Sequence, residues 1–298
     1  MNEQFPHRRE LKFRAKRWMM HPSCVRVTLL LVCVMLAFFG VRYLLGANLT
    51  YALVSLENYQ DTATGIYYNA EGFSIIFRMD LTQMVLAIPL TYDQLTAFLV
   101  AAVVTFLVLS PLRMGAMEQY WSVLRGGQPK INQVFRWYTQ PGRLGKAWAV
   151  EFVLQVLVRL VGIIATIPSL YLYYTFYTTV TSLEQMSTGA SLLQSAAALL
   201  AMAAAIFCFW LHSLFLPVRY CLAAHPEYSL KETFRRGLRS MKGYRSKFFW
   251  FRMTFAVWFF LSQLTYNALD LFVLPYTSMA SMLYIQEVAR FRQQQQGA

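Results

Sequence analysis

Three polar side chains in an otherwise apolar segment are the residues whose types and spacing could support chemistry. Glu151, Gln155 and Arg159 follow one another at intervals of four residues, which places them along one face of an α-helix, a polar stripe. Arg159 lies about 18 Å along this segment from Ala147, at 1.5 Å per residue, and a charge at that depth in a bilayer costs about 2.5 kcal/mol or more. The stripe could line a transport route or bind an anionic headgroup. It could also be a packing device, in which Arg159 pairs within the protein or extends to the interface.

The other polar residues form no pattern typical of catalysis or metal binding. His212 and Ser213 are adjacent in an apolar segment that offers no acid nearby, so we expect neither a metal nor a catalytic dyad there. The chain contains no HExxH, GxSxG or phosphate-binding loop, and no His and Asp cluster of the kind that a phosphodiesterase metal site needs. The sequence therefore predicts no catalytic residues, no cofactor and no metal, and a protein that is not an enzyme.

The composition indicates a membrane protein. Of the 298 residues 57% are apolar and only 14% are charged, whereas soluble domains carry about a quarter charged residues. The net charge of +13 favours positive loops on the cytoplasmic leaflet over a nucleic-acid partner, because the basic residues are divided among short loops. We expect the whole chain, 1–298, to form one integral membrane domain.

Six apolar segments of about the length that a ~30 Å hydrocarbon layer requires predict an all-α bundle of six transmembrane helices. The longest connection, 47–93, is rich in aromatic and β-branched residues and should form ordered external structure, either a hairpin or a surface helix. Most basic residues fall on one side of the spans, so the positive-inside rule predicts cytoplasmic termini in the plasma or inner membrane. The expected spans are 25–45, 94–112, 147–172, 192–218, 248–267 and 271–289.

Between the spans, basic amphipathic segments predict helices that lie in the headgroup plane. Ser229 and Glu232 form a capping box that marks the start of one such helix, and Pro129 and Pro141 bracket another. Anionic lipid headgroups are therefore the expected partner, and another membrane protein is a second possibility. The candidate headgroup-binding residues are Arg136, Arg235, Arg236, Arg239 and Lys242.

An internal repeat is also indicated. Phe13-Arg14, Phe135-Arg136 and Phe234-Arg235 each precede the next span by 12 to 14 residues. Pro111 and Pro217 end the second span of the first two units. This order favours three copies of a surface helix followed by a helical hairpin. Ordinary alternation of basic loops with spans is the alternative.

The stretches PLRMGAMEQYWSVLRGG, LPVRYCLAAHPEYSLKETFRRGLRSMKG and VLPYTSMASMLY resemble the bacterial DUF975 family of polytopic membrane proteins. The likeness covers about residues 100–290 and includes the family-like pair Pro275 and Tyr276. The family is distantly similar to the membrane domain attached to some glycerophosphodiester phosphodiesterases. The resemblance implies a fold and a membrane location without a reaction.

Two functions remain open from the sequence. The first is a non-catalytic membrane module that binds lipid or another membrane protein. The second is a small transporter or permease that uses the polar stripe and the helix breaks at Pro168 and Pro275. We favour the module because six spans with so few polar residues can hardly line a route for a solute.

The predicted topology can be tested with single cysteines introduced in a background that lacks the four native ones. Cysteines at Thr62 and Ser187 should react with an impermeant reagent in intact cells. Cysteines at Gln128 and Lys242 should react only after permeabilisation. External labelling at Lys242 would refute the six-span arrangement.

Overall fold

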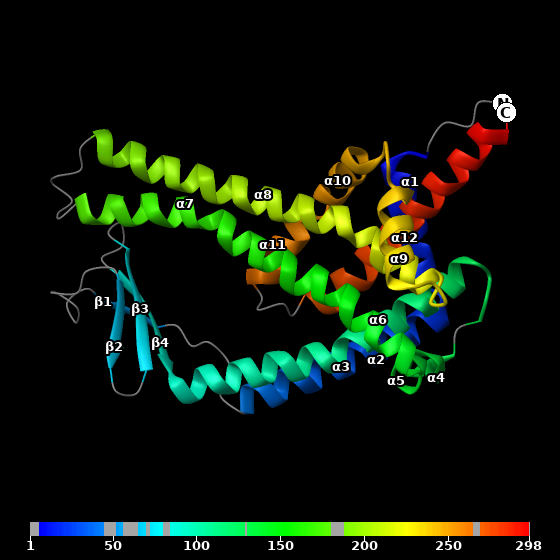
Figure 1. Ribbon diagram of the computed structural model, residues 1–298, viewed down its shortest axis with the longest axis horizontal. Helices are drawn as coiled ribbons and strands as arrows, with labels where there is room; N and C mark the ends of the chain where they lie inside the picture. The colour runs from blue at the N-terminus through cyan, green and yellow to red at the C-terminus, as the bar shows by residue number, and fades with distance from the viewer. Residues whose placement is uncertain are drawn as a thin grey trace. The chain divides into compact units, whose positions relative to one another are not determined.

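The computed structural model describes residues 6–44, 52–55, 65–69, 72–79, 84–128, 130–179, 188–264 and 269–297. These residues form helices and one four-stranded sheet (Figure 1). The helical architecture expected from the sequence is confirmed, and the sheet is an addition that the all-α class does not include. The chain divides into two compact units. Unit 1 comprises Met1–Leu36, Phe106–Leu160 and Cys208–Ala298, and unit 2 comprises Ala37–Thr105 and Val161–Phe207.

Four of the long helices carry an internal proline: α3 holds Pro111, α7 holds Pro168, α8 holds Pro217 and α12 holds Pro275. A proline is tolerated there because neighbouring groups in a helical membrane protein can satisfy the carbonyl that it leaves unpaired. In chain order the helices are α1 (Arg8–Met19), α2 (Pro22–Leu44), α3 (Tyr92–Leu124), α4 (Ile131–Val134), α5 (Arg136–Thr139), α6 (Pro141–Glu151), the π-helical segment η2 (Phe152–Leu157), α7 (Val158–Thr179), α8 (Thr188–Ala224), α9 (Leu230–Ser240), α10 (Arg245–Met253), α11 (Ala256–Leu264) and α12 (Asp270–Gly297).

Three helical stretches are long and apolar enough to cross a membrane: Tyr92–Leu124, Pro141–Tyr173 and Ser191–Ala224. The bent pair Arg8–Met19 and Pro22–Phe38, with 81° between the two helices, gives a fourth if it counts as one span. In the three stretches, between 17% and 28% of the most apolar window is buried inside the protein. The rest of this apolar surface is exposed, and it is more stable in contact with lipid than with water. The predicted spans 94–112, 147–172 and 192–218 fall within these helices.

The count of six spans is not confirmed. The predicted fifth span, 248–267, falls on α10 and α11, which a break after Met253 separates, and residues 265–268 lie outside the described part. The predicted sixth span, 271–289, falls on α12. Most of its side chains from Met279 to Val288 are buried by the protein itself, so this helix shows little of its apolar surface.

The segment 47–93, for which the sequence left a hairpin or a surface helix open, contains four strands. They are β1 (Ala52–Ser55), β2 (Gly65–Asn69), β3 (Gly72–Met79) and β4 (Met84–Thr91), all antiparallel, in the order β1-β4-β3-β2. β-Branched and aromatic residues favour the extended backbone, and β2 and β3 form a hairpin with Tyr68 opposite Phe73.

Within unit 1, α1 lies along α12 (Figure 1). Leu11 and Ala15 of α1 are fully buried, and Arg14 Nη1 lies 2.9 Å from Glu287 Oε1. The ammonium of Lys12 stands 4.5 Å from the centre of the Phe255 ring, a cation–π contact. The N-terminal basic segment is therefore an integral part of this unit.

The surface helix α9 begins where the capping box predicts. Ser229 is its N-cap, and the Glu232 amide donates to Ser229 Oγ at 3.3 Å. Its buried residues are small: Thr233 is fully buried, and Gly237 lies against Val218 of α8. A Cβ atom at Gly237 would lie 2.6 Å from Val218 Cα. The two backbones therefore approach as closely as only glycine permits.

This close approach can be tested by adding a single methyl group. We expect Gly237→Ala to lower the stability of the protein by about 1–3 kcal/mol, because backbone rather than a flexible side chain must move. Gly145→Ala is the matched control, since a Cβ there meets nothing within 4 Å and alanine improves helix propensity by up to about 1 kcal/mol. Thermal unfolding in detergent measures both. Equal melting temperatures for the two variants would contradict the close packing of α9 on α8.

Candidate functional site

The carboxylate of Glu151 is the buried acid around which the candidate site is built. Its side chain is fully buried at the end of α6. Arg219 of α8 holds both of its oxygens: Nε lies 2.6 Å from Oε1, and Nη2 donates to Oε2 at 2.6 Å. The first contact is an ion pair without hydrogen-bond geometry, and the second is a charge-assisted hydrogen bond, which is stronger than a bond between neutral groups. Arg219 is itself 11% exposed, so the pair is nearly dry.

The structure brings together only two of the three residues of the predicted polar stripe. Gln155 Nε2 donates to Glu151 Oε2, so these two residues lie together. Arg159 is exposed, beside the exposed apolar side chain of Leu160, and no hydrogen bond or ion pair joins it to another described residue. The prediction assumed regular α-helical spacing. Between Phe152 and Leu157, however, the chain is π-helical, and such irregular turns are frequent at functional sites.

A second buried cation, Arg252 of α10, lies in the same unit. It is 6% exposed and donates from Nη1 to Ser213 Oγ at 2.8 Å and to His212 Nδ1 at 3.0 Å. Its guanidinium also lies 4.8 Å from the centre of the Phe209 ring, a cation–π contact that offsets part of the cost of its burial. Sequence reasoning missed Arg252 because it placed this residue at a membrane interface. An arginine that directly follows four aromatic residues was the available signal.

These charges are close enough to act on one another. The guanidinium groups of Arg252, Arg219 and Arg159 all lie within electrostatic range of the partly buried ring of His212. Glu151 is the only acid bound to any of these three groups in the part of the chain that the structure describes. Arg219 is therefore neutralised by Glu151, and Arg252 is left as a nearly buried cation without a bound acid in the described part of the chain.

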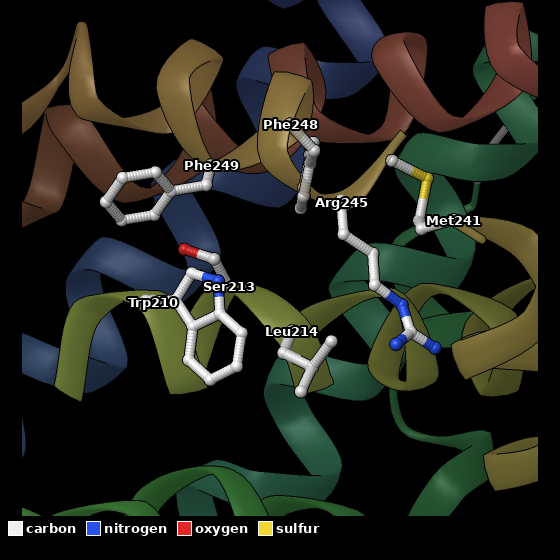
Figure 2. Close-up of a pocket in the computed structure, with 7 residues that line it drawn as sticks. All are labelled: Trp210, Ser213, Leu214, Met241, Arg245, Phe248 and Phe249. Atoms are coloured by element: carbon white, nitrogen blue, oxygen red, sulfur yellow. The ribbon is translucent and has the colours of Figure 1, made fainter. Parts of the chain in front are cut away.

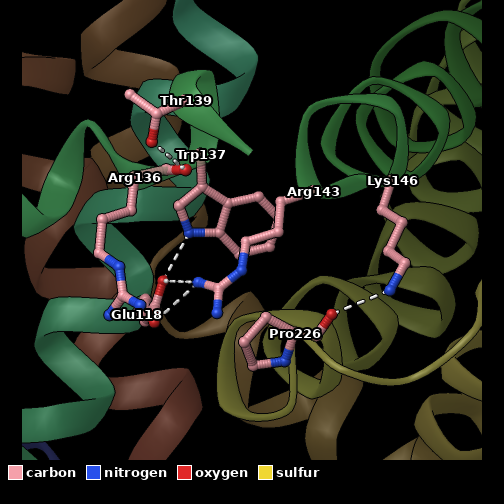
Figure 3. A network of polar contacts seen from close by, with 7 residues as sticks. All are labelled: Glu118, Arg136, Trp137, Thr139, Arg143, Lys146 and Pro226. Carbon is pink, nitrogen blue, oxygen red and sulfur yellow. Dashed lines mark hydrogen bonds and ion pairs between the residues drawn. The ribbon is translucent and has the colours of Figure 1, made fainter. Parts of the chain in front are cut away.

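A third polar cluster joins α3 to the surface helices (Figure 3). The buried indole of Trp137 donates from Nε1 to Glu118 Oε2 at 2.6 Å, and Arg143 Nη1 lies 3.4 Å from Glu118 Oε1. Lys146 donates to the Pro226 carbonyl at 3.0 Å, which ties α6 to the turn before α9. Nearby, burial raises the pKa of Tyr138 to about 12, so its hydroxyl stays protonated and donates to the Val108 carbonyl. The surface helices are thus firmly attached.

All five candidate headgroup-binding residues are exposed. Arg236 is partly engaged, because it lies 2.6 Å from Glu232 and donates to Tyr228 Oη at 2.8 Å. Arg292 donates to the Arg239 carbonyl at 3.2 Å, at the C-terminal end of α9, where a cation is favourable. These contacts orient α9 with its basic face outward. The exposed candidates are Arg136, Arg235, Arg236, Arg239 and Lys242.

The family-like pair Pro275 and Tyr276 of α12 makes packing contacts inside the protein. Pro275 is buried, and the Tyr276 ring meets the Phe255 ring edge-on, with 5.6 Å between centroids. Its hydroxyl reaches the Lys12 carbonyl of α1 at 3.5 Å. Among the described residues, no group of three or more His, Cys, Asp or Glu side chains could hold a metal ion.

The protein belongs to the class of helical membrane proteins. Its long apolar helices have a mostly exposed surface, and a nearly dry ion pair lies inside. Residues 60–291 match the model of a family described as a protein of unknown function, DUF975. The chain therefore belongs to this family, and the resemblance found in its sequence is confirmed. No curated protein and no solved structure matches the chain. Nothing in these comparisons supports the likeness to glycerophosphodiester phosphodiesterases.

Proposed function

We propose that this protein is a multi-pass membrane module that binds anionic lipid headgroups and has no catalytic activity of its own. The observation that carries the proposal is how its charges are distributed. In unit 1 four acids are engaged by arginine partners: Glu151 with Arg219, Glu118 with Arg143, Glu232 with Arg236, and Glu287 with Arg14 and Arg290.

Several basic side chains that pair with none of these acids face outward. Arg235, Arg239 and Lys242 are exposed around α9, and Arg136 is exposed on α5. Each basic residue near an anionic leaflet contributes about 1 kcal/mol of attraction. A surface that exposes many cations next to lipid-facing helices is suited to anionic headgroups, and the same surface could receive another membrane protein.

The arrangement in the membrane is part of the proposal. We infer six spans, with α10 and α11 together as the fifth and α12 as the sixth, and both termini on the basic, cytoplasmic side of the cell membrane. A threefold repeat fits this arrangement. Each proposed copy ends in a long helix with an internal proline, at Pro111, Pro217 and Pro275, and each begins with a basic surface helix.

Transport is the alternative, and the contacts of the polar stripe favour the module over it. A transport route would need Glu151 or Arg159 to face water in a cavity. Glu151 is instead held by Arg219 and Gln155 with none of its side chain exposed. Arg159 lies on the outer surface beside exposed Leu160 and Ile163, where its side chain can extend toward the headgroups.

The proposal predicts that the protein selects anionic lipid through α9. Full-length protein extracted from vesicles of equal phosphatidylglycerol and phosphatidylcholine should retain mainly phosphatidylglycerol, as measured by native mass spectrometry. The triple variant Arg235→Gln, Arg239→Gln, Lys242→Gln should lose about a hundredfold of this preference, at about 1 kcal/mol for each charge. Raising the salt concentration should weaken the preference of the native protein.

The matched control keeps the three charges. Arg235→Lys, Arg239→Lys and Lys242→Arg together should retain the preference for phosphatidylglycerol. If the glutamine variant retains as much phosphatidylglycerol as the native protein, the proposed function is refuted.

A further inference from the structure

A hollow in unit 1 between α8 and α10 is lined by both apolar and polar side chains (Figure 2). Its walls are the apolar side chains of Leu214, Met241, Phe248 and Phe249, around about 240 Å³ of unfilled space, including the part that is open to the outside. In Figure 2 the indole of Trp210 and the guanidinium of Arg245 lie on opposite sides of Leu214. The hollow therefore offers an apolar wall and a cation at its edge.

Arg245 is the charged residue among those that line the hollow. Arg245 is exposed, and one nitrogen of its guanidinium donates to the Leu238 carbonyl at 3.2 Å. Ser213, which also lines the hollow, accepts a hydrogen bond at 2.8 Å from Arg252, the nearly buried cation behind it. No acidic side chain lines this hollow. Its electrostatics are therefore complementary to an anion.

The surroundings of the hollow indicate what kind of anion fits. On α10, which carries Phe248 and Phe249 of the hollow, and on the following α11, Trp250, Val257 and Trp258 are more than half exposed, so these helices offer apolar surface suited to lipid chains. Trp210 itself is 41% exposed, and tryptophan prefers the membrane–water interface. A small free anion would leave the apolar wall without a partner, whereas an amphiphile would cover both the wall and the cation.

We propose that this hollow binds the phosphate and the adjoining acyl segment of an anionic phospholipid. The guanidinium of Arg245 pairs with the phosphate in a bidentate contact, which its planar fork permits and an ammonium does not. Arg252 adds positive potential from behind Ser213. Trp210, Leu214 and Phe249 cover the first part of the acyl chain. The inference rests on the proposed function, and it adds one defined lipid site to a generally basic surface.

Fluorescence of Trp210 can report this site directly. The full-length protein is placed in phosphatidylcholine vesicles that contain a small fraction of brominated phosphatidylglycerol or, in parallel, of brominated phosphatidylcholine. Bromine quenches tryptophan at contact, and the difference between the native protein and Trp210→Phe isolates the signal of this residue. We expect brominated phosphatidylglycerol to quench Trp210 several-fold more than brominated phosphatidylcholine at equal fraction.

The variants separate a defined site from general surface charge. Arg245→Gln should reduce the preference for phosphatidylglycerol at Trp210 by about tenfold or abolish it, as expected for one lost charge-assisted hydrogen bond. Arg245→Lys should weaken it by less. Lys247→Gln is the matched control: it removes one charge from the same helix, and Lys247 is exposed and does not line the hollow. It should keep the preference.

The outcomes also distinguish this inference from the proposed function. If Arg245→Gln and Lys247→Gln reduce the quenching equally, or if Arg245→Gln changes nothing while its thermal stability is native, the defined site is refuted. The selectivity of α9 measured by mass spectrometry stands or falls separately. Millimolar inorganic phosphate that removes the preference would assign the hollow to a free anion and overturn the lipid assignment.

Discussion

A carboxylate that has been taken out of water is tolerated in this fold because a guanidinium reaches it from another helix. Glu151 ends α6 where the π-helical segment begins, and Arg219 follows Pro217 in α8. Loss of either partner would leave an uncompensated buried charge, which typically costs about 3–5 kcal/mol. The pair therefore fixes how α6 and α8 meet. Two further contacts position α9. Lys146 donates a hydrogen bond to the Pro226 carbonyl, and Gly237 packs directly on Val218.

The cost of burying a charge without a partner also determines where the other charged side chains of this basic chain can lie. A cation inside must find a carboxylate, as Arg219 does, or polar and aromatic neighbours, as Arg252 does with Ser213 and Phe209. Unlike Arg252, several cations with no acidic partner in the described part of the chain lie on the surface, among them Arg235, Arg239 and Lys242. The buried Glu151 neutralises Arg219 inside the protein and leaves these exposed cations uncompensated, and this is why we connect the buried pair with the binding of anionic lipid.

Local sequence patterns predicted those parts of the fold that local physics determines. The spans at 94–112, 147–172 and 192–218 are predominantly apolar, and the start of α9 at Ser229 follows from its capping box. Features that depend on distant neighbours were not predictable. Nothing around Glu151 in the sequence points to Arg219, which lies 68 residues away, and the burial of Arg252 depends on α8. The strands in 47–93 stayed ambiguous because aromatic and β-branched residues also occur in helices.

A double-mutant cycle on Glu151 and Arg219 tests the central claim that this pair is closed and nearly dry. The stabilities of the native protein, Glu151→Gln, Arg219→Met and the double variant are measured by unfolding in detergent. We predict that Arg219→Met alone is destabilising by about 3–5 kcal/mol. The double variant should recover much of that loss, with a coupling energy of about 1 kcal/mol or more. If the two single effects simply add, Glu151 and Arg219 do not depend on each other, and the polar stripe would be open to water as a transport route requires.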